Sequence, residues 1–277
     1  MTLPNFLIIG AAKAGTTSLY EHFRAHPGIF MPRLKEARFF NYDGRGSRVK
    51  FPVQTLEEYE ALFEDAAGAT AIGEATPHYL NFPEAAGRIH ALLPAVKLVA
   101  SLRNPVDRSY SIYQMNQRNN AVNEGIPYGE AMQTDRHLRE GYAAHLERFL
   151  ALFPREQLEV ILLEDLEAKP KPTLAGLFGF LGVDPGFTPD VSKVANPGGT
   201  PRIKLLHDLL GNKKLIAATR GVIPETLVRP LKALRSRNLQ KSALPAADRR
   251  AATALFRDDI LRTQDLIGRD LSHWLQA

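Results

Sequence analysis

Short apolar runs alternate with amphipathic segments along most of the chain. Continuous apolar character predicts buried strands at residues 6–10, 96–102 and 158–163, because a parallel strand is covered on both faces. Each run is followed by a segment with helical spacing of its apolar residues. This alternation predicts an α/β fold, with a central parallel sheet flanked by helices, in a single domain over residues 1–277.

Helix caps and chain breakers define the remaining elements. Asn104 before Pro105 is typical of a helix N-terminus, and Gly182 is typical of a helix C-terminus. A strand at the edge of the sheet is predicted at residues 71–75. Helices are predicted from a cap at Thr16 or Thr17 to about residue 25, and at residues 56–63, 83–93, 105–118, 128–153, 173–181, 203–217 and 246–268. Long loops are predicted at residues 28–55 and 185–201, and loops of that length are usually functional.

The turn after the first predicted strand has the composition of a phosphate-binding loop. Residues 10–18 read GAAKAGTTS, and such small residues let backbone amides approach an anion. Thr16 or Thr17 is predicted to cap the next helix, whose dipole adds partial positive charge. In the Walker pattern a lysine directly follows the second glycine, whereas here Lys13 precedes Gly15 by two residues. The turn therefore predicts a P-loop-like domain and a phosphorylated ligand other than Mg-ATP; an ordinary turn with an exposed lysine is the alternative.

A second polar group follows the predicted strand at residues 96–102. Arg103 comes directly after that strand, and Ser111 lies nearly two turns into the next helix. Ligands of open α/β sheets bind at the carboxyl ends of strands, so Arg103 and Ser111 are candidates to hold a second phosphate. The alternative is that Arg103 pairs with Asp107 and that Ser111 only faces solvent.

Together, the two motifs resemble those of the sulfotransferases that use 3′-phosphoadenosine 5′-phosphosulfate (PAPS). The resemblance implies that Lys13 stabilises charge on the bridging oxygen of the donor, and that Arg103 and Ser111 hold its 3′-phosphate. The implied product is adenosine 3′,5′-bisphosphate (PAP). The residues implied to bind the phosphosulfate are Lys13, Ala14, Gly15, Thr16, Thr17 and Ser18.

Further segments resemble the heparan-sulfate-type branch, which acts on carbohydrates, and its bacterial members. Residues 35–40 are similar to the segment with the catalytic glutamate of that branch, which implies that Glu36 takes the proton from the acceptor. Residues 73–79 resemble another active-site segment, and residues 266–274 resemble the C-terminal segment of bacterial members. Eukaryotic carbohydrate members often carry a lysine where Ala75 stands, so no role for such a lysine is implied here.

Three more residues are candidates for the site. His78 is the rival base, because it lies within residues 73–79 and sulfotransferases of the cytosolic type use a histidine. Arg202, or else Lys204, is a candidate contact to the 3′-phosphate if residues 196–202 close over the donor, and a plain surface turn is the alternative. Glu74 is a candidate for orienting a neighbour or binding the acceptor.

Composition narrows the function classes. The 277 residues include no cysteine, which excludes disulfides, thiolate metal sites and cysteine nucleophiles and fits a cytoplasmic location. The net charge of +5 suits an anionic ligand, but the basic residues are scattered, so no nucleic-acid partner is predicted. The apolar run at residues 6–9 is too short for an integral membrane segment. No metal is predicted, because no His/Asp/Glu cluster has metal-ligand spacing.

The leading hypothesis is transfer of a sulfuryl group from PAPS to a hydroxyl, or an amine, of a carbohydrate or other small acceptor. A P-loop nucleotide kinase or related phosphotransferase is the alternative. The offset of Lys13 and the lack of a clear Walker B acid count against it. The sequence leaves open the acceptor, the residues that contact adenine and the oligomeric state.

Overall fold

A computed structural model describes residues 2–42, 44, 51–118, 125–190, 200–201, 239–240 and 243–276. The strands are β1 (Phe6–Gly10), β2 (Ile29–Phe30), β3 (Ala71–Ala75), β4 (Lys97–Leu102), β5 (Leu158–Leu162), β6 (Thr200–Pro201) and β7 (Leu239–Gln240). The α-helices are α1 (Thr16–Ala25), α2 (Leu56–Ala61), α3 (Ala85–Leu92), α4 (Pro105–Arg118), α5 (Tyr128–Thr134), α6 (Ala143–Leu150), α7 (Leu163–Ala168), α8 (Pro170–Leu181) and α12 (Ala246–Ile267). Short 3₁₀ helices are η1 (Phe39–Asn41), η2 (Arg136–Arg139), η3 (Arg155–Gln157) and η4 (Ser272–Leu275).

The chain divides into two compact units. The first takes Met1–Arg108, Gly141–Ala195 and Leu255–Gln276, and the second takes Ser109–Glu140, Asn196–Ala254 and Ala277. The boundary falls inside α4, between Arg108 and Ser109. The prediction of one domain over residues 1–277 stays a prediction.

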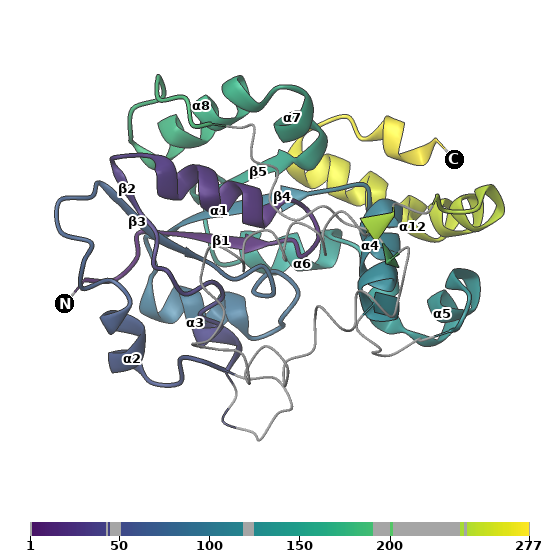
Figure 1. Cartoon of the computed structure of the whole chain (residues 1–277), viewed down its shortest axis with the longest axis horizontal. Coiled ribbons are helices and arrows are strands. Elements are labelled where there is room, and N and C mark those ends of the chain that lie inside the picture. The colour runs from purple at the N-terminus through teal and green to yellow at the C-terminus, as the bar shows by residue number, and fades with distance from the viewer. Residues whose placement is uncertain are drawn as a thin grey trace, which may run out of the picture. The chain divides into compact units, whose positions relative to one another are not determined.

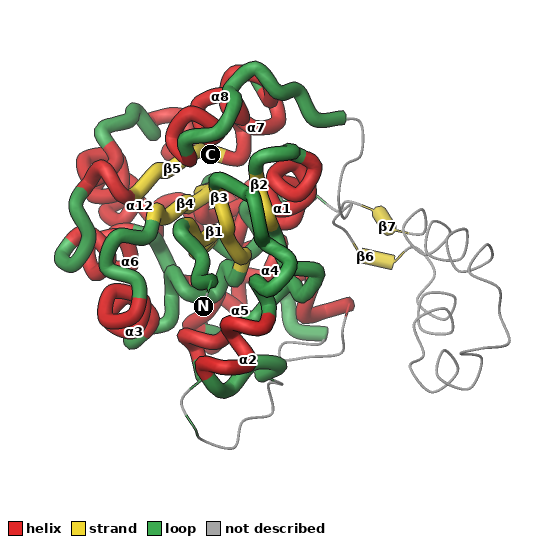
Figure 2. Tube along the Cα trace, turned by 90° about the vertical axis from the view of Figure 1, so that its left-hand side faces the viewer, coloured by secondary structure: helices red, strands yellow, loops and turns green. Residues whose placement is uncertain are grey.

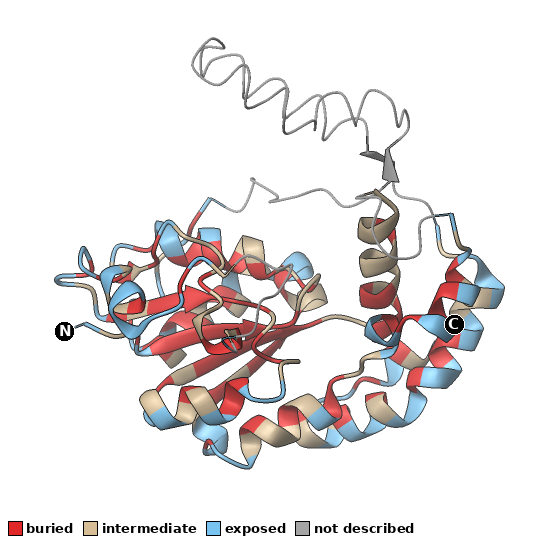
Figure 3. Ribbon diagram, turned by 90° about the horizontal axis from the view of Figure 1, so that it is seen from below, coloured by how far each residue is buried: buried red, intermediate tan, exposed pale blue. Residues whose placement is uncertain are grey.

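A five-stranded parallel sheet forms the centre of the first unit. Its strand order is β2-β3-β1-β4-β5, so β1 lies in the middle and pairs with both β3 and β4. Every residue of β1 is buried, as expected for a strand covered on both faces. Figure 2 shows the strands side by side between helices, and Figure 3 shows the buried residues concentrated along them.

Successive side chains along each strand point to opposite faces of the sheet, so the core has two layers. Helices α1, α7 and α8 cover one face of the sheet, while α3 and α6 lie on the other (Figure 1). The first layer joins apolar side chains of the strands to those of α1, α7 and α8, among them Phe6, Ile8, Leu19, Phe23, Val99, Ile161, Leu166, Leu177 and Phe178. Because the strands are parallel, the turns after β1, β3 and β4 all leave from the same edge of the sheet.

The second unit contains a group of tyrosines between α4 and α5. Tyr113 and Tyr128 pack edge to face with ring centroids 5.4 Å apart, and the Tyr128 hydroxyl donates to Ser109 Oγ at 2.9 Å. The Tyr113 hydroxyl donates to the Ile126 carbonyl at 2.7 Å. These contacts hold α5 against α4. Strands β6 and β7 pair antiparallel in the same unit.

The predicted fold class is confirmed. The strands and helix ends with the clearest sequence patterns lie where they were predicted. The strands at residues 6–10, 96–102 and 158–163 are β1, β4 and β5. Asn104 caps α4 by accepting from Val106 N at 2.9 Å, and Gly182 ends α8 with a φ of 78°. The helix predicted at residues 203–217 lies outside the described residues.

Several predicted elements were wrong in detail. The strand at 71–75 is not at the sheet edge, because the two-residue β2 pairs with its outer side; β2 is too short to leave a periodic signal. The helix at 128–153 is broken into α5, η2 and α6, since Asp135 accepts from His137 N at 2.9 Å and starts a new turn. Helix α8 begins at Pro170, and α7 before it was not predicted.

Gly73 of β3 provides a test of this packing. A Cβ at Gly73 would lie 2.4–2.5 Å from ring atoms of Phe6, which is fully buried. We expect Gly73→Ala to lower the free energy of unfolding by about 1–3 kcal/mol, because the ring must shift within a packed core. Gly87 of α3 is the matched control, since it is exposed with nothing within 4 Å of its added Cβ, and Gly87→Ala should stabilise by roughly 0.5–1 kcal/mol. Urea unfolding of both variants checks this, and equal destabilisation would contradict it.

Candidate active site

The turn between β1 and α1 depends on two glycines. A Cβ at Gly10 would lie 2.6 Å from the Cβ of Leu80, so the backbone approaches closely there. Gly15 has a φ of 80°, and its added Cβ would lie 2.5 Å from Cδ1 of Leu163. A larger residue at either position would displace the turn, and at Gly15 it would also be strained.

The same turn is fixed to β4. The N–H of Ala11 donates to the carbonyl of Ser101 at 2.7 Å, and the Ser101 hydroxyl donates to the carbonyl of Ala14 at 2.6 Å. Ser101 is fully buried. The turn is therefore held in position by the protein itself.

Helix α1 presents its N-terminus at the end of this turn. Gly15 is the N-cap and no side chain caps the helix, so the prediction that Thr16 or Thr17 serves as the cap was wrong. Both threonines lie inside the first turn, because the carbonyl of Gly15 already accepts from Leu19 N at 3.1 Å. The first amides of a helix have no carbonyl partner within it, and together with the helix dipole they suit an anion.

Two lysines approach this N-terminus. Lys13 lies in the turn itself, half-buried, with a left-handed φ of 69°. Lys35, from the loop after β2, places Nζ 3.5 Å from the Thr17 hydroxyl. Burial lowers the pKa of Lys35, and the nearby carboxylate of Glu36 partly offsets this. The sequence did not indicate Lys35 as a site residue, because its position becomes clear only when the loop folds onto α1.

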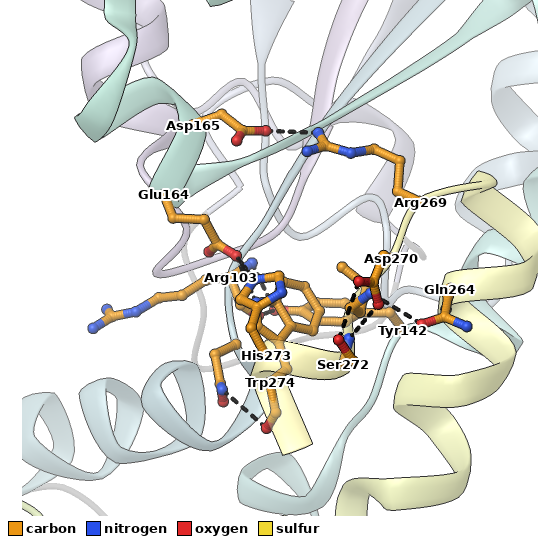
Figure 4. Close-up of polar contacts among 12 residues, drawn as sticks. Arg103, Tyr142, Glu164, Asp165, Gln264, Arg269, Asp270, Ser272, His273 and Trp274 are labelled. Atoms are coloured by element: carbon orange, nitrogen blue, oxygen red, sulfur yellow. Dashed lines mark hydrogen bonds and ion pairs between the residues drawn. The ribbon is translucent and has the colours of Figure 1, made fainter. Parts of the chain in front are cut away.

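Arg103 joins the second motif to the first. Its guanidinium NH1 donates to the carbonyl of Lys13 at 3.5 Å, so it reaches the turn after β1. The Tyr142 hydroxyl holds its backbone by accepting from Arg103 N at 3.3 Å and donating to Arg103 O at 2.7 Å. Figure 4 shows the Arg103 side chain extending away from the ring of Tyr142.

The C-terminal segment supports this arrangement (Figure 4). The amide of Asn104 donates to the carbonyl of Trp274 at 3.3 Å, and the indole N–H of Trp274 donates to Glu164 Oε1 at 2.6 Å. His273 Nε2 lies 2.5 Å from the same oxygen. Trp274 is 1% exposed, so it belongs to the core.

Tyr142 is itself fixed from two sides. Its backbone N–H donates to both carboxylate oxygens of Asp259, at 3.0 and 2.8 Å, and the Arg108 guanidinium lies 5.1 Å from its ring centroid. Burial raises the pKa of the phenol, which keeps the hydroxyl able to donate. No sequence pattern indicates Tyr142, because its contact with Arg103 joins residues 39 positions apart.

Glu36 lies in the loop after β2 and is paired with Arg38. Arg38 Nε and NH2 reach Glu36 Oε2 at 3.0 and 2.9 Å, and the Glu36 side chain is 21% exposed. The loop is anchored to α1 by the Tyr20 hydroxyl, which donates to the Pro32 carbonyl at 2.7 Å. Glu36 is thus an accessible carboxylate in a fixed loop, on the same segment as Lys35.

Glu74, on β3, is fully buried beneath this loop. Its carboxylate accepts from the Thr76 hydroxyl at 2.9 Å and from the Tyr59 hydroxyl at 3.5 Å. Burial raises the pKa of Glu74 to about 7, although these hydrogen bonds partly oppose the shift. The carboxylate also lies close to the hydroxyl of Tyr79, whose pKa is raised by burial and by Glu74.

The structure says less about the other predicted site residues. His78 lies half-buried in the turn after β3, where its carbonyl accepts from the Asn41 amide at 3.4 Å. Ser111 lies on α4, in the second unit. Arg202 and Lys204 lie outside the described residues. The roles assigned to these residues, and to Lys13 through Ser18, stay predictions.

Among the residues that the structure describes, no group of three or more His, Cys, Asp or Glu side chains is placed to hold a metal ion. The donors around the turn after β1 are instead amides, hydroxyls, lysines and an arginine, a set that suits an anion. In the same described ranges, every helix is too short or too polar to cross a membrane.

Comparison with known proteins decides the family. Residues 3–194 match the family model described as "Sulfotransferase domain". The chain belongs to the sulfotransferase family. The crystal structure of a sulfotransferase from Alicyclobacillus acidocaldarius is similar over 100% of both chains, with a TM-score of 0.76 and 28% identity. The protein is therefore a transferase, and the family resemblance inferred from the two motifs is confirmed.

Two other relatives extend the comparison. The bifunctional heparan sulfate N-deacetylase/N-sulfotransferase 4 of Mus musculus is 33% identical in an alignment 244 residues long, which covers 79% of this chain and 26% of that protein. The sulfotransferase thus spans about a quarter of that relative's length. Mouse sulfotransferase SULT7A1, crystallised with PAP, shares the fold over 96% of this chain and 87% of its own, with a TM-score of 0.51 and 14% identity.

The buried carboxyl of Glu74 makes stability depend on pH. Its pKa is about 7 in the folded protein, above the ordinary value of 4.5 that we expect in the unfolded chain. Between these values the folded state keeps a proton that the unfolded state releases, so this group destabilises the fold as pH rises. The free energy of unfolding of the wild type relative to Glu74→Gln should fall by about 3 kcal/mol from pH 4 to pH 8. Urea unfolding across that range checks this, and parallel pH curves for the two proteins would contradict it.

Proposed function

We propose that this sulfotransferase moves a sulfuryl group from PAPS to a hydroxyl, or an amine, of a carbohydrate or other small acceptor. The observation that carries the proposal is the contact between Arg103 and the carbonyl of Lys13. This contact brings Arg103, at the end of β4, close to a turn suited to phosphate. A ligand with two separate phosphates requires two such anion-binding groups close together. Such a ligand is PAPS, which carries a phosphosulfate at one end and a 3′-phosphate at the other.

In this proposal the turn binds the phosphosulfate. The amides at the start of α1 and the hydroxyls of Thr16, Thr17 and Ser18 donate to its oxygens, and the backbone of Ala14 and Gly15 leaves room for it. Lys13 stabilises the negative charge that develops on the leaving phosphate. When bound, PAPS supplies a sulfuryl group joined to a good leaving group.

Arg103 and Ser111 are proposed to hold the 3′-phosphate. Support for Arg103 comes from its backbone, which the Tyr142 hydroxyl fixes on both sides. An arginine offers two parallel N–H donors to a phosphate, and a preorganised arginine loses less entropy on binding. Ser111 is included because the sequence places it nearly two turns into α4. Arg202 is retained as a further proposed contact.

Glu36 is the proposed general base, because it carries an accessible carboxylate on the loop that touches α1. It would take the proton from the acceptor while Lys13 stabilises the leaving phosphate. His78 is the rival base, because the turn that carries it also contacts the loop of Glu36.

The nature of the acceptor is the most open part of the proposal. The relative from Mus musculus is named for sulfation of heparan sulfate nitrogen, which favours an amine or hydroxyl of an amino sugar. An acceptor screen with radiolabelled PAPS tests this class, using N-deacetylated heparosan, simple sugars and phenols. Transfer only to phenols would overturn the carbohydrate assignment and leave the donor assignment intact.

Donor binding provides the direct test of the function. Calorimetric titration should show that PAP binds the wild type, and that Arg103→Ala weakens this binding roughly tenfold to a hundredfold, as expected from loss of a charge-assisted hydrogen bond. Arg262→Ala is the matched control, because Arg262 pairs with Glu147 at an exposed site on α12. Binding of ATP with Mg²⁺ but not PAP would favour the kinase alternative and overturn the proposal.

Turnover separates the two candidate bases. Glu36→Gln should lower kcat by about a hundredfold or more, because the substitution removes the proton acceptor while keeping the shape. Its PAP affinity should stay within about twofold of the wild type, because a base for the acceptor does not hold the product nucleotide. His78→Ala should retain most of the turnover. The reverse pattern would assign the base to His78.

A further inference from the structure

A chain of hydrogen bonds runs from the buried Glu74 to the surface loop of Glu36. The Thr76 hydroxyl donates to Glu74 Oε2 at 2.9 Å, and the same oxygen of Thr76 accepts from the backbone N–H of Arg38 at 3.1 Å. Arg38 in turn binds Glu36 through two nitrogens. The chain therefore joins strand β3 to the proposed base in three steps.

Thr76 has one hydroxyl proton, and this makes the chain directional. With the proton on the bond to Glu74, a lone pair of the oxygen is available to the N–H of Arg38. Thr76 and Glu74 are both fully buried, so water does not replace either partner without displacing packed groups. A carboxylate at Glu74 can only accept, which fixes the direction of the Thr76 hydroxyl.

The direction of the Thr76 hydroxyl affects the loop through Arg38, whose backbone N–H donates to it. Its φ of 58° lies in the left-handed region, which a residue with a Cβ adopts only when its surroundings hold it there. The hydrogen bond to Thr76 is one such restraint. Both nitrogens of Arg38 contact Oε2 of Glu36, and among the described residues no hydrogen bond reaches Oε1, so that oxygen is left for an acceptor proton.

We propose that Glu74 is a positioning residue, which acts through Thr76 and Arg38 to orient the carboxylate of Glu36 toward the acceptor. The inference rests on the proposed function, because it assigns Glu36 the role of base. In the described part of the chain Glu74 makes no hydrogen bond to the turn after β1 or to Glu36, so its effect is on geometry.

The surroundings of Glu74 make this orientation sensitive to pH. Tyr59 faces it from α2, Tyr79 and Thr76 face it from the turn after β3, and Glu36 and Lys35 act on it from the loop. Its pKa of about 7 means that it changes charge near neutral pH. A protonated Glu74 no longer enforces the direction of the Thr76 hydroxyl.

The experiment compares Thr76→Val, Thr76→Ser and Glu74→Gln with the wild type. Release of PAP from PAPS is measured with N-deacetylated heparosan as acceptor, and PAP affinity is measured by calorimetry. Thr76→Val keeps the shape but removes the hydroxyl, so kcat should fall by roughly tenfold to a hundredfold with PAP affinity within about twofold. Thr76→Ser restores the hydroxyl and should recover at least half of the wild-type kcat (roughly).

Thr263→Val is the matched control. Thr263 is also a fully buried threonine, but its hydroxyl makes no hydrogen bond within the described residues, so kcat should be unchanged. The ratio of wild-type to Glu74→Gln turnover should increase with pH through about 7, and using the ratio cancels any titration of the acceptor.

Each outcome decides one of the two proposals. A wild type that binds PAP and transfers sulfuryl groups, with Thr76→Val no slower than Thr263→Val, would overturn the positioning role alone. Loss of PAP binding in Thr76→Val would show a structural effect and also overturn it, as would a ratio that does not change with pH. A wild type that neither binds PAP nor releases it from PAPS would overturn the proposed function, and this inference with it.

Discussion

The attachment of the turn after β1 to strand β4 is the constraint on which the rest of the site depends. Ser101 accepts from Ala11 through its carbonyl and donates to Ala14 through its hydroxyl, so one residue fixes both ends of the turn. The sheet therefore sets the position of the helix N-terminus, and it sets that of Arg103, which directly follows β4. Preorganised donors do not have to be ordered when a ligand arrives, which favours both affinity and catalysis.

Glu74 on β3 and Lys35 in the loop after β2 illustrate the cost of placing charge near such a site. Glu74 is buried where a carboxylate is unfavourable, and Lys35 is drawn toward a helix N-terminus where a cation is unfavourable. Neither the buried carboxyl of Glu74 nor the position of Lys35 stabilises the fold. Both are understandable if the region is organised for chemistry on an anionic donor, since functional sites commonly hold groups that the folded state alone would not favour.

The sequence predicted the elements whose signal is local. Strand β1 is a continuous apolar run, and Asn104 before Pro105 is a helix start that both residues specify. It could not predict β2, which has two residues and depends on β3 for its existence. It also predicted a hydroxyl cap on α1, because threonine preference is a local statistic, whereas the left-handed Gly15 is selected by the path of the turn and the side chain of Leu163.

The residues of the site also fall into two groups, those that a short sequence motif indicates and those that only contacts in the folded structure identify. Lys13 and Arg103 stood out because each lies in a short motif next to a strand, whereas Glu36 was indicated by the resemblance of residues 35–40 to the heparan-sulfate-type branch. Tyr142 and Thr76 did not stand out, because their importance comes from contacts with residues 39 and 38 positions away. The contact between Thr76 and Arg38 joins two loops that meet only after the sheet has formed. Such supporting residues have no sequence signature of their own, so only the folded structure identifies them.

The bond between Glu164 and Trp274 has a consequence for how the protein is made. It joins residues 110 positions apart, and the carbonyl of Trp274 then accepts from Asn104, beside Arg103. During synthesis the turn after β1 emerges well before Trp274, the partner of Asn104. Contacts of such long range form late, because the chain between them must first be ordered. A nascent chain that ends before residue 259 would thus carry the turn without Asp259, which holds Tyr142, and without Trp274, which holds Asn104, so the support of Arg103 would be incomplete.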